Sequence, residues 1–187
     1  TMQELIEQFS LERVSKSGAK FDYEKGKWFN HQYLQLRSNE ELAEQFMPYL
    51  EEKGVSGDRA TVAKVIGLTK DRVNFVSELW DQVNFFFVAP TEYDEKSLKK
   101  RWKEDSPKHM TEMLALLEAH DDWSAEGLDN LIMPWIAEKE YGVGIVMNAF
   151  RICLVGAARG PHIWNITDVL GKEETLRRVK TALEKLS

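Results

Sequence analysis

The sequence predicts an all-α protein of two packed helical bundles, preceded by a short N-terminal segment of mixed or irregular structure. Three observations support this prediction. Apolar residues recur three and four positions apart through most of the chain, which is typical of amphipathic helices. Sustained alternation of apolar and polar residues, the pattern of a half-buried strand, is almost absent. Turn formers divide the chain into roughly ten helical segments, and no repeat of fixed period relates them.

The first half is expected to contain four of these helices. The first covers residues 2–9 and is followed by a stretch rich in turn formers. Ser38 begins a capping box and therefore marks the start of the second helix. A short helix covers residues 60–66, and Thr69 is expected to cap a longer one that closes near Pro90.

The second half repeats this style. Its expected helices cover residues 97–103, 108–120, 143–155 and 163–170, with two more beginning at Ser124 and after Gly171. The segment 143–155 is nearly all apolar, so we expect a buried helix there. Trp28 and Trp135 are expected to be buried anchors, and Phe85, Phe86 and Phe87 to pack in the core.

Composition indicates an ordinary globular protein of 187 residues, of which 43% are hydrophobic and 30% charged. No apolar run approaches the roughly 20 residues that span a bilayer, and the N-terminus lacks a signal-peptide pattern. The single cysteine, Cys153, excludes an internal disulfide and suits a reducing compartment, so we expect a cytoplasmic protein. A net charge of −6 excludes a uniformly basic nucleic-acid binder but not a local basic surface.

No catalytic or metal-binding motif is recognisable. The histidines are scattered and lack the spacing of metal ligands: His31, His109, His120 and His162. Neither a phosphate-binding glycine loop nor a nucleophile elbow occurs. We therefore expect binding rather than catalysis, with no metal site.

One arginine stands inside the apolar run FRICLVGAARGP at residues 150–161. A guanidinium has five donors and stays charged, so an apolar setting without a partner is unfavourable. Arg151 therefore either snorkels to the surface or is held in a cleft for a carboxylate, a phosphate or a base edge. The turn at Gly160 and Pro161 would let a ligand approach the backbone closely.

A basic cluster surrounds Trp102. Its members are Lys96, Lys99, Lys100, Arg101 and Lys103. Basic residues interleaved with an aromatic ring can meet a phosphate backbone and a base. The alternative is a solvated helix face with Trp102 in the core.

Three stretches carry a further signal. FSLERVSKSGAKFDYEKGKWFNHQYL (9–34) contains the pattern Phe-Asp-x-x-Lys-x-x-Trp-x-Asn-x-x-Tyr, and TKDRVNFVSELWDQVNFFF (69–87) ends in a phenylalanine-rich helix. YGVGIVMNAFRICLVGAARGPHIWNITDVLGKEETLRRVKTAL (141–183) combines an apolar helix, an arginine, a Gly-Pro turn and Leu-Gly-Lys-Glu. In this order the three stretches resemble the C-terminal part of bacterial glutamyl-tRNA synthetases. The matching positions of the first stretch are Phe21, Asp22, Lys25, Trp28, Asn30 and Tyr33.

The resemblance implies three parts: the end of a stem-contact region at residues 1–36 and two anticodon-binding helical subdomains at 37–92 and 93–187. The catalytic domain, with its ATP and magnesium, would lie upstream, so this chain alone would hold no cofactor and be inactive. The partner would be tRNA(Glu), with no role for DNA or a membrane, and the protein would be a monomer.

The resemblance also implies which residues meet the anticodon. These are Arg151, Gly160, Pro161 and Ile163 in the second subdomain and Arg72 in the first. The candidate phosphate contacts are Lys99, Lys100 and Arg101.

Two rival functions stay open at this point. A helical protein–protein interaction module without a nucleic-acid role explains the acidic charge and the amphipathic helices as well. A glutaminyl enzyme is disfavoured, because its anticodon region is built from β-barrels and strand signals are poor here.

Overall fold

The computed structural model describes residues 1–14, 16–18 and 20–186, and all regular secondary structure in these ranges is helical. The α-helices are α1 (Met2–Gln8), α2 (Tyr23–Leu36), α3 (Asn39–Glu52), α4 (Arg59–Gly67), α5 (Leu79–Phe87), α6 (Glu95–Arg101), α7 (Ser106–Ala119), α8 (Ala125–Glu138), α9 (Val143–Val155) and α10 (Ile163–Leu186). Three single 3₁₀ turns are η1 (Leu11–Arg13), η2 (Lys70–Arg72) and η3 (Val76–Glu78). The predicted fold class is confirmed.

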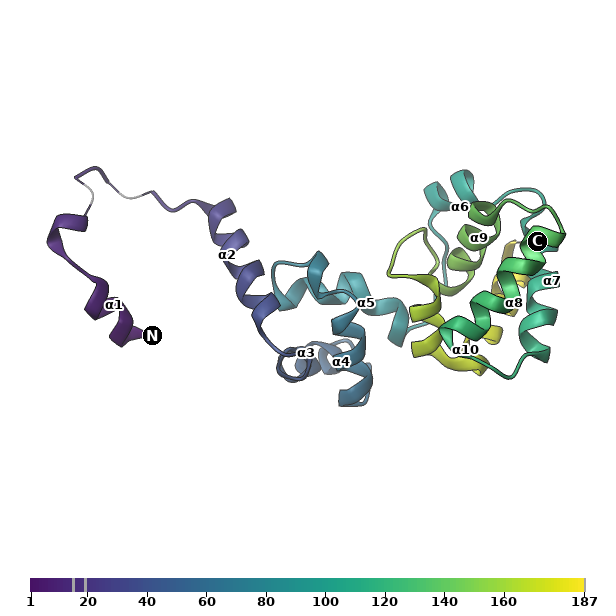
Figure 1. Cartoon of the computed structure of the whole chain (residues 1–187), viewed down its shortest axis with the longest axis horizontal. Helices are drawn as coiled ribbons and strands as arrows, with labels where there is room; N and C mark the ends of the chain where they lie inside the picture. The colour runs from purple at the N-terminus through teal and green to yellow at the C-terminus, as the bar shows by residue number, and fades with distance from the viewer. Residues whose placement is uncertain (15, 19, 187) are drawn as a thin grey trace.

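The helices lie in two groups along an elongated molecule (Figure 1). Helices α3 to α5 form the first bundle, α6 to α10 form the second, and α5 reaches toward the second. Helix α1 stands apart at the N-terminal end, and all its residues are exposed. One apolar cluster runs through both bundles. Its largest fully buried members include Phe46, Leu50, Leu79, Met110, Ile132 and Phe150.

Helix α2 corrects the expectation of irregular structure before Ser38. Asp22 begins it, because its carboxylate accepts the backbone N–H of Lys25 at 3.1 Å. Leu34 is its only buried residue, so the apolar periodicity that usually reveals a helix is weak. Trp28 is 57% exposed, and its prediction as a buried anchor is wrong.

The single helix expected from Thr69 to Pro90 is also wrong. The Thr69 hydroxyl donates to the carbonyl of Val65 in α4 at 3.0 Å. It therefore bonds to the end of α4 and does not cap a following helix. Val73 is extended, and the Glu78 carboxylate accepts the N–H groups of Asn74 and Phe75 at 2.8 and 3.3 Å. The chain therefore forms two 3₁₀ turns before α5 begins.

The second bundle agrees closely with its predictions. Seven residues of α9 are buried, although its first turn is open: Val143 is 50% exposed. Gly171 interrupts α10 with a φ of 74° and a ψ of 173°, a conformation that only glycine adopts readily. Trp135 and Phe85 are buried as expected, and Trp102 packs against the core at half burial.

Candidate nucleic-acid interface

The candidate interface begins at the end of α9. The buried residues of this helix fix its face toward the core, and Arg151 lies at the border of that face, half-buried. Gly156 ends the helix in the left-handed conformation with a φ of 79°. Residues 156–162 then form a loop that folds back over the last turn of α9.

Backbone carbonyl groups of this loop hold Arg151. Its Nη1 donates to the carbonyl of Pro161 at 2.6 Å and to that of Arg159 at 3.2 Å. Among the residues that the structure describes, Arg151 forms no ion pair. The guanidinium is therefore fixed in direction while its positive charge stays available to a ligand.

The turn after Arg159 brings its backbone close to other side chains. Gly160 has a φ of 106°, and a Cβ there would lie 3.1 Å from Phe85 Cζ and 3.5 Å from Arg151 Nη1. Both the positive φ and the short distance to Phe85 therefore favour glycine at this position. Pro161 and Ile163 are buried, so they shape the site from beneath, whereas Gly160 is half-buried.

Arg72, the second candidate arginine, belongs to the first bundle. It ends η2, and its side chain is 40% exposed. Burial lowers the pKa of Arg151, and the positive charge of Arg72 lowers that pKa further. Arg72 itself lies 3.9 Å from the carboxylate of Asp71, so Arg151 is the arginine of the two that has no carboxylate neighbour among the ion pairs of the described residues.

Helix α2 supports the segment that carries Arg72. The Gln35 amide donates to the carbonyl of Lys70 and His31 Nδ1 to that of Val73, both at 2.8 Å. Asn30 donates to the carbonyl of Asn74. Polar side chains of α2 that are bonded to backbone therefore help to position this segment, together with the burial of Val73.

The sequence did not single out Arg159, although the structure gives it a part in the interface. Its guanidinium donates to the carbonyl of Asp81 and to Asn84 Oδ1, the latter at 3.0 Å, and lies 5.6 Å from the centre of the Phe85 ring. The loop is thereby attached to α5 of the first bundle. Only its place next to Gly160 in the sequence could have drawn attention to it.

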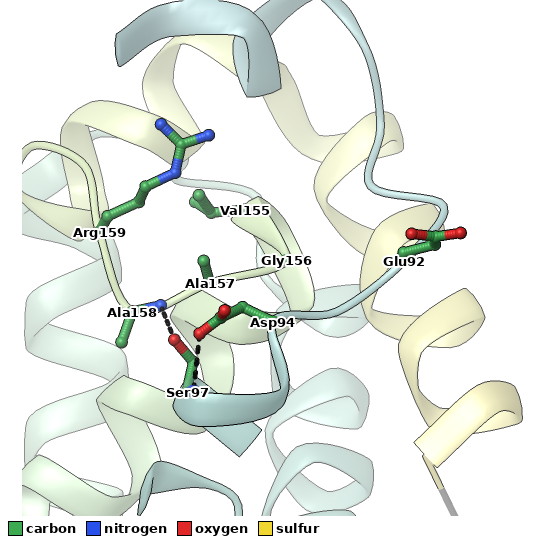
Figure 2. Close-up of a pocket in the computed structure, with 8 residues that line it drawn as sticks. All are labelled: Glu92, Asp94, Ser97, Val155, Gly156, Ala157, Ala158 and Arg159. Atoms are coloured by element: carbon green, nitrogen blue, oxygen red, sulfur yellow. Dashed lines mark hydrogen bonds between the residues drawn. The ribbon is translucent and has the colours of Figure 1, made fainter. Parts of the chain in front are cut away.

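An open cavity of about 490 Å³ is lined by the same loop, from Gly156 to Arg159 (Figure 2). Ser97 Oγ accepts the N–H of Ala158 at 3.0 Å, and Asp94 Oδ1 accepts the N–H of Ser97 at 2.7 Å. The first bond ties the start of α6 to the loop, and the second caps α6 itself. The candidate phosphate contacts Lys99, Lys100 and Arg101 follow one turn later on α6, and all three are exposed.

A known family matches most of the chain. The model of the anticodon binding domain matches residues 41–183, which cover both bundles. The chain belongs to the anticodon binding domain family. The family assignment favours nucleic-acid recognition over the rival of a protein-interaction module.

The relatives of this anticodon-binding chain are longer proteins. It is 58% identical over 186 residues to the glutamate–tRNA ligase of Bacteroides thetaiotaomicron and 52% identical to that of Porphyromonas gingivalis. In each case the match covers all of this chain and 37% of the relative. The crystal structure of a glutamate tRNA ligase from Elizabethkingia meningosepticum, in complex with its amino acid, superimposes with a TM-score of 0.92 at 39% identity and the same coverage.

The described residues contain neither a membrane-spanning helix nor a cluster of metal ligands. Across residues 1–14, 16–18 and 20–186, no helix is long and apolar enough to span a bilayer. Over the same ranges no three histidine, cysteine or acidic side chains come together in a way that could hold a metal ion.

Proposed function

We propose that this chain recognises the anticodon of tRNA(Glu) as the C-terminal part of a glutamate–tRNA ligase. The ligase would activate glutamate with ATP and magnesium in an upstream domain and transfer it to the tRNA. In this proposal the chain alone binds RNA, holds neither ATP nor magnesium, and is catalytically inactive. It works as a monomer in the cytoplasm, without DNA or a membrane as partner.

The observation that carries this proposal is Arg151, whose guanidinium the carbonyls of Arg159 and Pro161 hold at the loop after α9. Arg151 stands beside the Gly160–Pro161 turn, and the positive charge of Arg72 in the first bundle acts on it. Anticodon bases are single-stranded and unstacked, so they expose their hydrogen-bonding edges to side chains. An arginine can donate two hydrogen bonds to the acceptors of one base, and each good pair discriminates by about 1–3 kcal/mol.

The other candidate residues take supporting roles. Gly160 lets the base edge approach the backbone, and buried Pro161 and Ile163 keep the turn in place. Lys99, Lys100 and Arg101 contact phosphates next to the anticodon. Residues 37–92 and 93–187 act as the two anticodon-binding subdomains, and residues 1–36 end the stem-contact region.

A binding titration with RNA stem-loops tests this proposal. The 187-residue chain is titrated with the anticodon stem-loop of tRNA(Glu) and with one that differs only in the anticodon. We expect at least about tenfold tighter binding of the native anticodon, as one good base contact supplies. Replacement of Arg151 by alanine should reduce this ratio toward one.

The matched control is Arg59→Ala, because Arg59 is an exposed arginine that pairs with Glu44 at the surface, away from the loop. It removes the same charge and should leave the ratio unchanged. Equal binding of both stem-loops by the unaltered chain would contradict the proposed function, and equal effects of the two variants would contradict the role of Arg151.

A further inference from the structure

Arg178 of α10 is the most deeply buried charged side chain in the described part of the chain, with 3% of its surface exposed. Its Nη1 donates to the carbonyl of Phe85 at 2.6 Å and to that of Leu154 at 2.7 Å. Its Nε donates to Glu174 Oε1 at 2.7 Å. One guanidinium thus joins three helices.

Both carbonyls belong to the ends of helices. Phe85 lies in the last turn of α5 and Leu154 in the last turn of α9. The last four carbonyls of a helix have no partner within it and carry the negative end of its dipole. The last turns of α5 in the first bundle and α9 in the second therefore meet at a single cation.

The carboxylate of Glu174 allows this cation to stay charged in the core. Without a partner, an isolated buried charge would be strongly unfavourable. Glu174 stands one turn before Arg178 on α10 and also accepts two bonds from Arg177 at 2.7 Å. The pair holds Arg178 at a fixed point from which it reaches both carbonyls.

The junction lies directly beneath the candidate interface. Leu154 is three residues from Arg151 on α9, and the Phe85 ring touches the region of Gly160 and Arg159. Arg72 belongs to the first bundle and Arg151 to the second. The distance between the two anticodon arginines therefore depends on how α5 and α9 are joined.

We propose that Arg178 is a positioning residue that fixes the two bundles relative to each other and so sets the selectivity of anticodon binding. The selectivity part rests on the proposed function, whereas the positioning part does not. Arg178 touches no RNA, because its guanidinium is enclosed by α5, α9 and α10.

Two measurements on the 187-residue chain test the proposal with the variants Arg178→Met and Arg178→Lys. The first is the distance distribution between spin labels at Glu51→Cys in α3 and Glu138→Cys in α8, which are exposed sites on different bundles. Cys153 stays unlabelled because it is buried. The second is the ratio of affinities for the native and the altered anticodon stem-loop.

We expect Arg178→Met to broaden the distance distribution and to reduce the affinity ratio by about tenfold, the loss of one good base contact. Both readouts for Arg178→Lys should lie between those of Arg178→Met and those of the unaltered chain, because lysine keeps the charge but not the planar fork. The control is Arg177→Met, which removes an exposed arginine bonded to the same carboxylate. It should leave both readouts unchanged.

A narrow, unaltered distance distribution in folded Arg178→Met would overturn the proposal, even if the melting temperature fell. If Arg178→Met does not fold, Arg178→Lys decides, and unchanged readouts there overturn it. An unaltered chain that fails to discriminate the stem-loops contradicts the proposed function. The distance measurement would still decide the positioning role in that case.

Discussion

At the scale of single residues, backbone carbonyls hold Arg151 without neutralising it. A carboxylate partner would have satisfied the donors and cancelled the charge together. Carbonyl groups leave the charge in place, and burial together with Arg72 makes that charge unfavourable while no ligand is bound. In the proposed function, an arriving acceptor relieves this cost, so Arg151 serves recognition rather than a structural ion pair.

Gly160 provides the prediction at this scale. Gly160→Ala places a methyl group 3.1 Å from Phe85 Cζ at a φ of 106°, where side chains are strained. We expect a loss of about 1–3 kcal/mol in the free energy of unfolding, measured by urea titration, and weaker binding of the native stem-loop.

The control for Gly160→Ala is Gly144→Ala on α9. A Cβ at Gly144 meets no atom within 4 Å, and the position is helical, so alanine should be neutral or slightly stabilising. A Gly160 variant as stable as the Gly144 variant would show that the turn tolerates a side chain.

At the scale of elements, the sequence predicted most helices, including the fully exposed α1, but missed α2. Helix α9 has buried residues throughout its last three turns and was predicted with its observed bounds. Helix α2 buries only Leu34 and attaches through Asn30, His31 and Gln35, so its apolar periodicity carried no signal. Its helix-starting Asp22 was the clue that remained.

The prediction of a single helix over residues 69–90 was wrong for a related reason. Val73, Leu79 and Val83 are all buried, as the helical spacing indicated, but side-chain bonds from Thr69 and Glu78 redirect the backbone between them. Such local competition between side chains and backbone is not visible in periodicity. The candidate site was recognised because a cation stands in an apolar run of the sequence. The roles of Arg159 and Arg178 depend on carbonyl groups far away in the sequence, so these two residues were not predicted.

Gln35 provides the prediction at this scale. Gln35→Ala removes the bond from α2 to the carbonyl of Lys70, which supports the turn carrying Arg72. We expect faster amide hydrogen exchange over residues 70–74 and a loss of stem-loop affinity smaller than that of Arg151→Ala. Gln32→Ala, an exposed position on the same helix, is the control. Equal exchange in both variants would show that α2 does not hold this turn.

At the scale of the whole molecule, the two bundles share one apolar cluster and are also joined by buried polar contacts at α5, α9 and α10. We expect the stability of this junction to depend on pH through Glu174. Bonds from Arg177 and Arg178 lower the pKa of Glu174 to about 2. A lowered pKa means that the ionised group stabilises the folded chain above its unfolded pKa of about 4.3 and loses this effect as pH falls toward 2.

Glu174→Gln should therefore destabilise the chain at pH 6, and the difference from the unaltered chain should shrink as the pH falls from about 4 to 2. Urea unfolding at several pH values measures this difference. Glu173→Gln, at an exposed neighbouring position, should show a smaller and more constant effect. A difference for Glu174→Gln that does not vary with pH would contradict the assigned ion pairs.

The last prediction concerns salt dependence. Since the net charge of the chain is −6, only a local basic surface can attract RNA in the proposed function. Each phosphate contact releases counterions, so the logarithm of the affinity falls with the logarithm of salt concentration by about 0.7 per contact on single strands. Replacement of Lys99, Lys100 and Arg101 by glutamine should therefore make the slope shallower by about 2 if all three bind phosphates. Changing Lys20, Lys53 and Lys139, which are exposed elsewhere, gives the same net charge and should leave the slope unchanged. Equal slopes in both triple variants would identify the α6 cluster as a solvated helix face and leave the two arginines as the main RNA contacts.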